Sequence, residues 1–246
     1  WVGLRGAQLS SSKGVVFTLS QWLEIAEPEL LRYFIFRSKP TKAKEFDPRT
    51  LPDLYDEYDL AEEVYFGKAE LPESRVEQVR RIYELSQTSG KPEQLPQRVS
   101  FRFAAVLCQV TKEEKRWLEI LKTRKVLVNP TPSDEKLAIR RIRLAERWVE
   151  TYAPEHLKFK VMEEAPEVEL LDKQRKGLKK LAKVISEGEL SPAELHNRIY
   201  EIAREVGLEP PALFQAIYLV LLGKTSGPRA GAFLSALDQN FVVNRF

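Results

Sequence analysis

The sequence predicts an all-α protein, and three observations support this prediction. First, the capping-box pattern, in which Ser or Thr stands three residues before Glu or Gln, occurs four times. Second, apolar residues recur every three or four positions, which is the spacing of one helix face. Third, no run of alternating residues is long enough for a substantial sheet. The four pairs are Thr18 and Gln21, Ser74 and Glu77, Thr111 and Glu114, and Ser191 and Glu194.

Taken in order, the elements begin with a polar loop at 8–14 and a short extended piece at 15–17, before a helix that starts at Thr18. Residues 213–222 are apolar nearly all round, which predicts a central helix that Gly223 ends. A second short extended piece is expected at 241–243. Two apolar stripes predict amphipathic helices: Ala138, Ile142, Ala145, Val149 and Tyr152, then Leu195, Ile199, Ile202 and Val206.

Proline and polar residues mark four breaks between helices, at 39–52, 88–96, 129–132 and 163–166. The length of 246 residues admits one large domain or two smaller ones. We therefore expect two helical subdomains with the main boundary at 89–96.

The composition excludes several classes of protein. A single cysteine, Cys108, and two histidines rule out an intrachain disulfide and a cysteine-rich zinc site, so we predict no metal centre. The longest apolar run, 216–222, is too short to span a membrane. We expect a cytoplasmic protein without a membrane partner. Because the first residue is Trp1 and a polar loop follows at once, we expect a piece of a longer protein.

The loop Gln8-Leu9-Ser10-Ser11-Ser12-Lys13-Gly14 is rich in hydroxyl groups and carries one lysine. Such a loop can contact phosphate oxygens through its hydroxyls, its backbone amides and the lysine charge. Composition alone favours a solvated linker over a phosphate-binding loop.

Basic residues raise a second possibility, contact with a polyanion. Lys136, Arg140, Arg143 and Arg147 share one helix face, and Lys173, Lys176, Lys180 and Lys183 share another. Each face is either simply solvated or binds phosphates, because the net charge of +3 is too small to decide. Phe101 and Arg102 could stack on and hydrogen-bond unpaired bases, while packing of Phe101 in the core is the alternative.

Longer stretches around the loop carry a resemblance to a known family. They are Trp1-Val2-Gly3-Leu4-Arg5-Gly6 before it, and 22–25, 30–35, 37–40, 45–47, 53–59, 65–67 and 227–234 after it. These segments resemble class I lysyl-tRNA synthetases of the archaeal type around and beyond their KMSKS signature. Gln8, Leu9 and Ser11 replace the usual lysine, methionine and lysine of that signature, whereas Ser10 and Ser12 match its serines. Lys13 follows directly as the substitute cation.

The resemblance implies an activity. In this family the loop folds over ATP and its Mg²⁺ while the lysine carboxylate attacks the α-phosphate, and the adenylate then acylates tRNA. Residues Gln8, Leu9, Ser10, Ser11, Ser12 and Lys13 would contact ATP, with Ser10, Ser12 and Lys13 stabilising the developing charge. The resemblance also implies a Rossmann domain before Trp1 that holds lysine, so this chain alone should not aminoacylate.

It also implies a division of the chain and a partner. Residues 1–17 would be the KMSKS segment, 18–92 a helical connecting subdomain that contacts the tRNA stem, and 93–246 an α-helical cage that binds the anticodon. The partner would be tRNA(Lys), bound by a monomer. The candidate contacts are Phe101, Arg102, Arg140, Arg143, Lys176, Lys180 and Arg229.

Two competing functions remain open from the sequence. The missing signature lysines favour a stand-alone RNA-binding helical module without ligase activity. A helical protein–protein scaffold is the third possibility. A steep loss of tRNA affinity with added salt separates both RNA-binding functions from the scaffold.

Overall fold

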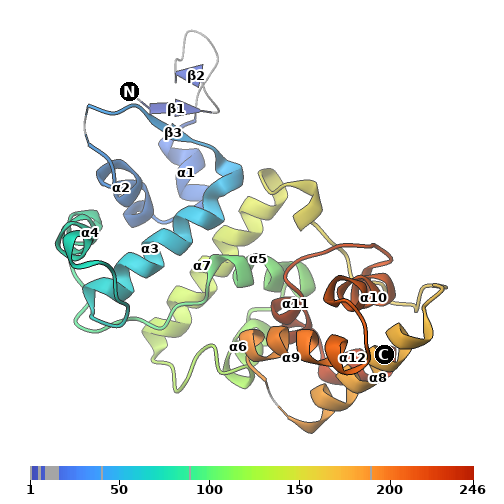
Figure 1. Ribbon diagram of the computed structural model, residues 1–246. Coiled ribbons are helices and arrows are strands. Elements are labelled where there is room, and N and C mark those ends of the chain that lie inside the picture. The colour runs from blue at the N-terminus through green and yellow to red at the C-terminus, as the bar shows by residue number, and fades with distance from the viewer. Residues whose placement is uncertain (1, 5–6, 9–16, 40, 89, 189) are drawn as a thin grey trace. The chain divides into compact units, whose positions relative to one another are not determined.

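A computed structural model describes residues 2–4, 7–8, 17–39, 41–88, 90–188 and 190–246 (Figure 1). Within these residues twelve α-helices and three short strands form, so the all-α prediction is confirmed. The first half contains β1 (Val2–Leu4), β2 (Ala7–Gln8), α1 (Leu19–Ile25), α2 (Pro28–Phe36), β3 (Lys44–Phe46), the 3₁₀ turn η2 (Pro48–Thr50), α3 (Leu51–Tyr65), α4 (Glu73–Ser86), α5 (Phe101–Val110) and α6 (Glu114–Thr123). The second half contains α7 (Pro132–Thr151), η3 (Glu155–Leu157), α8 (Asp172–Glu187), α9 (Pro192–Glu205), α10 (Pro210–Leu222), α11 (Ala230–Ala236) and α12 (Gln239–Arg245).

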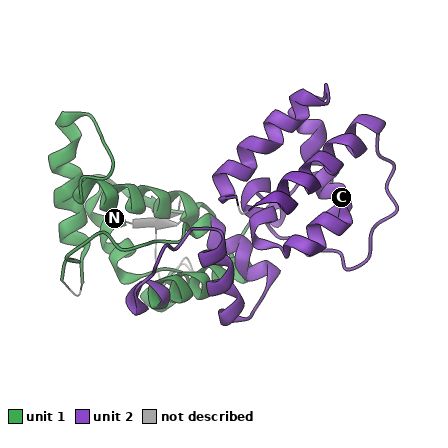
Figure 2. Ribbon diagram, turned by 90° about the horizontal axis from the view of Figure 1, so that it is seen from below, with its two compact units in different colours: residues 1–102, 136–153 green, residues 103–135, 154–246 purple. Residues whose placement is uncertain are grey.

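The chain forms two compact units, which Figure 2 colours separately. Unit 1 comprises residues 1–102 and 136–153, and unit 2 comprises residues 103–135 and 154–246. Unit 1 is therefore discontinuous in sequence, because most of α7 belongs to it. The functional division at 17 and 92 stays a prediction.

The core of unit 1 lies among α2, α3, α4 and α7. Helix α3 packs on both α2 and α4. The predicted stripe of α7 is buried at Ala138, Ile142 and Ala145, and it continues to Trp148, whose indole N–H donates to the Pro48 carbonyl at 2.6 Å. A small sheet of order β2-β1-β3 stands at the N-terminal end, with β1 antiparallel to β2 and parallel to β3.

The core of unit 2 surrounds α10. Helix α9 packs against α10 and α11, while α8 packs against α10 and α12. As predicted, α10 is buried on most sides, and its end at Gly223 is confirmed. Gly223 has φ +64°, a left-handed conformation that glycine adopts without a Cβ penalty.

Two of the four predicted capping boxes are confirmed, at Thr18 and Ser191. The other two are wrong. Helix α4 begins after Pro72 with no side-chain cap, so Ser74 already lies inside the first turn. The Thr111 hydroxyl instead accepts from the Glu113 N–H at 3.3 Å, which leaves α6 to begin at Glu114.

The extended piece expected at 241–243 is also wrong, because these residues are helical in α12. The Asp238 carboxylate caps this helix by accepting from the Phe241 N–H at 3.0 Å. Val242 is buried and α12 packs against α8, so tertiary packing overrides the strand preference of the two valines. The expected piece at 15–17 lies largely outside the described residues, and Phe17 itself has no regular structure.

Candidate ATP loop and nucleic-acid interface

The two ends of the candidate ATP loop are both attached to unit 1. Residues Leu9, Ser10, Ser11, Ser12 and Lys13 lie outside the described residues. Before them, Gln8 ends β2 and pairs with Gly3 of β1. The sheet therefore fixes where the segment 9–16 begins.

After the segment, Phe17 forms an aromatic cluster with three rings. Its ring centroid lies 5.2 Å from that of Phe46, 5.9 Å from that of Tyr152 and 6.5 Å from that of Trp22. Phe46 ends β3 and Tyr152 follows α7, so the cluster joins the sheet to that helix. Aromatic pairs at these distances contribute about 0.5–1.5 kcal/mol each beyond their burial. A short unsupported linker would not require such an attachment.

The start of α1 is equally well defined. The Thr18 hydroxyl accepts from the Gln21 N–H at 3.2 Å, and the Gln21 side chain accepts from the Thr18 N–H at 2.8 Å. The Trp22 indole donates to the Glu27 carbonyl at 3.1 Å and closes the turn between α1 and α2. The chain that follows the loop therefore enters a helix with a fixed direction.

Beneath these elements lies a buried arginine. The side chain of Arg141 on α7 is 2% exposed, and its Nη1 donates to both carboxylate oxygens of Asp59 at 2.9 and 2.7 Å. Nη1 also donates to the Val99 carbonyl at 3.2 Å, and the guanidinium lies 4.8 Å from the centroid of the Tyr55 ring. The carboxylate of Glu27, at 3.5 Å from Nε, completes the surroundings.

Burial opposes every charge in this cluster, and it prevails at Asp59, whose pKa it raises despite the charge of Arg141. Burial disfavours the charged form of Arg141, but the carboxylates of Asp59 and Glu27 outweigh it and raise the pKa of the guanidinium. Burial likewise disfavours the Glu27 carboxylate, yet the charge of Arg141 and the hydroxyl of Tyr55 lower its pKa. The cluster joins α3, α7 and the turn before α2.

Phe101 lies in the core of unit 1. Its side chain is fully buried, stacked on Tyr55 with centroids 4.1 Å apart and against Trp148 at 5.6 Å. Burial therefore favours the core-packing interpretation over base stacking. Arg102 is exposed, but its guanidinium pairs with Asp53 and, at 2.7 Å, with Asp56. Its charge is already compensated by α3.

The basic face of α7 remains on the surface of unit 1. Arg140 and Arg143 are exposed, as is Lys136. Arg147 pairs with Glu24 at 3.2 Å and with Glu150 at 3.5 Å. Arg140 makes no ion pair with any described residue, which leaves its charge available to a partner.

The basic face of α8 likewise contains some lysines with internal partners among the described residues and some without. Lys180 pairs with Glu205 at 2.9 Å, and Lys173 donates to the Gly207 carbonyl at 3.0 Å. Lys176 is exposed and pairs with no carboxylate in the described part of the chain. Arg229, immediately before α11, is exposed and likewise pairs with none. The predicted contacts thus belong to both units: four of them to unit 1, and Lys176, Lys180 and Arg229 to unit 2.

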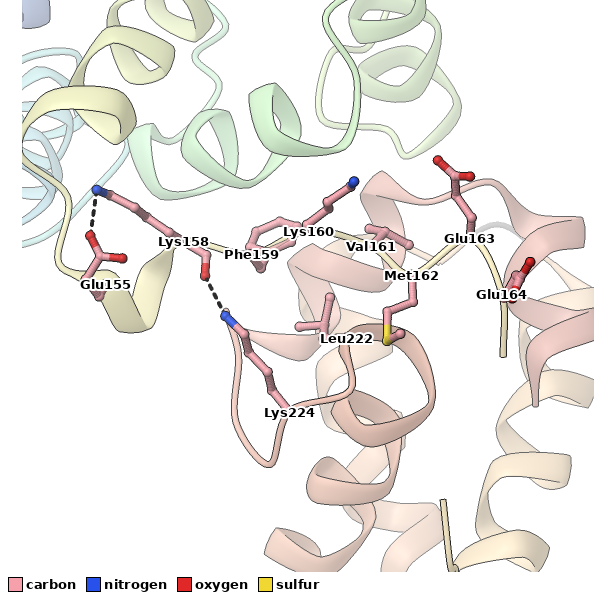
Figure 3. A pocket seen from close by; sticks show the side chains of 10 residues that line it. All are labelled: Glu155, Lys158, Phe159, Lys160, Val161, Met162, Glu163, Glu164, Leu222 and Lys224. Carbon is pink, nitrogen blue, oxygen red and sulfur yellow. Dashed lines mark hydrogen bonds and ion pairs between the residues drawn. The ribbon is translucent and has the colours of Figure 1, made fainter. Parts of the chain in front are cut away.

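Unit 2 also contains an open groove of about 720 Å³ between residues 158–164 and the end of α10 (Figure 3). Lys158 pairs with Glu155 at 2.8 Å, and Lys224 donates to the Lys158 carbonyl at 3.3 Å. Glu163 and Glu164 add further negative charge along the same segment. The groove is lined by three glutamates as well as by Lys158, Lys160 and Lys224, and this balance of charge makes it a poor site for phosphate.

The described residues offer neither a metal site nor a membrane-spanning helix. No group of three His, Cys, Asp or Glu side chains there is arranged to hold a metal ion. No single helix among them is long and apolar enough to cross a membrane.

Comparison with known proteins shows which family the chain is similar to. A family model described as class I tRNA synthetases (K) matches residues 1–89. The lysine–tRNA ligase of Methanosphaera stadtmanae is 37% identical over 100% of this chain and 49% of its own length. The ligase of Methanocaldococcus jannaschii is 40% identical over 100% of this chain and 48% of its own length, and that of Pyrococcus horikoshii is 36% identical over the same shares.

Over its whole length the chain is similar to class I lysyl-tRNA synthetases, and residues 1–89 match the model of that class. It spans about half the length of the curated relatives it matches. The resemblance expected from the residues around the loop is therefore confirmed. The similarity to the synthetases covers both units, since the relatives match the chain from end to end.

Sequence reasoning missed the buried cluster of Arg141. A signal was available, because Arg141 follows Ala138 by three residues and so falls within the apolar stripe of α7. An arginine at such a position must find buried partners, but the sequence does not say which.

Proposed function

We propose that this chain is the carboxy-terminal half of a lysine–tRNA ligase, which activates lysine with ATP and Mg²⁺ and transfers it to tRNA(Lys). The observation that carries this proposal is the match over the whole chain to lysine–tRNA ligases at 33–40% identity. The rest of the ligase would supply the lysine pocket and most of the ATP site. The stand-alone RNA-binding module is not favoured by any separate observation.

Within that enzyme, the segment Gln8–Lys13 serves as the loop that closes on ATP, with Mg²⁺ accompanying the phosphates. Ser10, Ser12 and Lys13 donate hydrogen bonds and positive charge to the phosphates as charge develops in the transition state. The attachment of Gln8 in β2 and of Phe17 in its aromatic cluster supports this role, because both ends of the loop keep a fixed origin.

The remainder of the chain binds tRNA. Exposed cations without a described acidic partner, Arg140, Lys176 and Arg229, are the best candidates for phosphate contact, since no internal ion pair must be broken first. Arg143 on the face of α7 is exposed too. Lys180 and Arg102 contribute less, because each already pairs with a carboxylate.

The loop is tested in the full-length protein by Lys13→Ala. We expect lysine-dependent pyrophosphate exchange to slow by on the order of 10²-fold, as on removal of one transition-state donor, with tRNA affinity unchanged. Lys42→Ala is the matched control, because Lys42 is exposed and makes no ion pair with any described residue. Equal exchange rates in the two variants would remove Lys13 from the mechanism.

The tRNA interface is tested by filter binding across salt concentrations. The logarithm of tRNA affinity should fall linearly with the logarithm of salt concentration, and Lys176→Ala should flatten that slope by about 0.9. Lys180→Ala should change it less, since Lys180 pairs with Glu205. Affinity that does not depend on salt would favour the protein scaffold.

A further inference from the structure

Unit 2 presents three aromatic rings together on its surface, and none of them belongs to the predicted tRNA contacts. His196 and Tyr200 lie one turn apart on α9, and Phe214 comes from α10. The three ring centroids are mutually 5.1–5.5 Å apart. Tyr200 is 37% exposed, and the other two rings are partly exposed. We call these three side chains the aromatic patch.

Most large aromatic side chains in the chain are core residues, so this exposure is informative. Phe101, Tyr55, Trp117 and Trp148, for example, are each 2% exposed or less. Tyr200 by contrast keeps more than a third of its surface in water. A clustered aromatic surface of this kind marks a binding site more often than an isolated exposed ring does.

Two glycines bring Arg229 close to the patch. A Cβ on Gly231 would lie 2.2 Å from the Pro192 carbonyl oxygen and 2.6 Å from Cβ of His196, so only glycine lets α11 approach α9 this closely. A Cβ on Gly227 would lie 2.8 Å from the Tyr218 ring, whose hydroxyl donates to the Pro228 carbonyl. The segment 227–231 is thereby held against α9 and α10.

The charges around the patch are positive and available. Arg229 lowers the pKa of His196, after burial of the ring, which shows that its guanidinium lies within electrostatic reach. Arg204 follows Tyr200 by one helical turn, is exposed and makes no ion pair with any described residue. The acidic neighbours Glu201 and Glu205 are occupied by Arg198, at 2.7 and 3.0 Å.

We propose that the aromatic patch of His196, Tyr200 and Phe214 is a stacking platform for an unpaired base of the tRNA anticodon loop, with Arg229 and Arg204 contacting the adjoining phosphates. This inference rests on the proposed function. Single-stranded RNA is recognised by bases stacked on aromatic rings beside cations, and both features are present here. A protein partner would need a larger continuous apolar surface, whereas cations flank this one.

The test uses the full-length protein and a tRNA(Lys) transcript in filter binding. Tyr200→Leu keeps an apolar side chain but removes the flat π-face, and Tyr200→Phe keeps the face. We expect Tyr200→Leu to weaken binding by about 5- to 150-fold, from 1–3 kcal/mol per stacked base, and Tyr200→Phe to bind like the wild type. Because Tyr200 is partly exposed, neither variant should unfold the protein.

Transcripts with one abasic anticodon position identify the stacked base. At that position, the abasic transcript should bind the wild type weakly and lose no further affinity to Tyr200→Leu, because the two changes remove the same contact. If the wild type binds tRNA but Tyr200→Leu and every abasic transcript bind equally well, the platform is refuted while the tRNA-binding function stands. If the wild type does not bind tRNA at all, both proposals fail.

Discussion

At the scale of single residues, the neighbours Arg140 and Arg141 show how differently one residue type can act. Arg140 is exposed and solvated, whereas the side chain of Arg141 is 2% exposed and paired with Asp59 and Glu27. Desolvating an arginine is costly unless carboxylates and hydrogen bonds compensate it. The first residue is therefore available to a partner, and the second organises the interior of unit 1.

We predict that Arg141→Leu destabilises the protein by about 3–5 kcal/mol, because two buried carboxylates lose their cation. Arg140→Leu is the matched control and should stay within about 0.5 kcal/mol of wild type. Urea unfolding followed by tryptophan fluorescence measures both, since Trp148 lies two helical turns from Arg141 in the same core. A cost below about 1 kcal/mol for Arg141→Leu would mean that the carboxylates are solvated or neutral.

The same pair marks a limit of sequence reasoning. Helical spacing correctly predicts which face of α7 is buried, as Ala138, Ile142 and Ala145 show. It also leaves Arg141 within that face without naming Asp59, which lies 82 positions earlier. Partners so distant in sequence are set by tertiary packing, and no local pattern encodes them.

At the scale of elements, a capping pattern in the sequence predicts the start of a helix correctly where no neighbouring residue starts the helix elsewhere. Thr18 and Ser191 each cap a helix as predicted, because their own backbones are extended and their hydroxyls accept from the N–H three residues later. Helix α4 begins directly after Pro72, which occupies the N-cap position. Ser74 therefore lies inside the first turn, where its hydroxyl cannot serve as the N-cap. The prediction of a strand at 241–243 is wrong because Asp238 caps a helix there and Val242 is buried on that helix.

The close approach of α11 to α9 gives a prediction at this scale. A methyl group on Gly231 would lie 2.2 Å from a backbone oxygen and 2.8 Å from the His196 amide nitrogen, neither of which can rotate away. We expect Gly231→Ala to cost about 1–3 kcal/mol and to weaken tRNA binding, since Arg229 moves with α11. Thermal unfolding and filter binding measure the two effects.

Gly188→Ala is the matched control, because nothing lies within 4 Å of a Cβ at Gly188 and its backbone is extended. It should leave both the unfolding midpoint and tRNA affinity unchanged. Equal behaviour of the two alanine variants would show that α11 has room to shift, and that the position of Arg229 does not depend on this contact.

At the scale of the whole molecule, the predicted boundary near residue 92 and the compact units differ in one respect. Proline and polar residues at 88–96 do lie in a loop between α4 and α5. Unit 1, however, also contains residues 136–153, which include most of α7. A break in composition signals a linker, but it cannot reveal that a later helix returns to the earlier unit.

Because most of α7 belongs to unit 1, a fragment that contains α7 without the rest of unit 1 should be destabilised. The fragment 93–246, the expected anticodon-binding domain, contains α7 but lacks Glu27, Pro48 and Asp59. Trp148 loses its hydrogen-bond acceptor, Arg141 loses both carboxylates, and the buried face of α7 meets water. Exposing or truncating one large core side chain costs about 3–5 kcal/mol, which is comparable to the stability of many domains.

We therefore expect the fragment 93–246 to bind a hydrophobic dye more strongly than the chain of 246 residues and to unfold with a broader transition. A version of the fragment with Arg141, Ile142 and Trp148 replaced by Gln should reverse the dye binding, because the same helix then presents a polar face. A sharp cooperative transition of the unmodified fragment, with no added dye binding, would establish 93–246 as an autonomous domain. In that case the boundary indicated by composition would be the physical one.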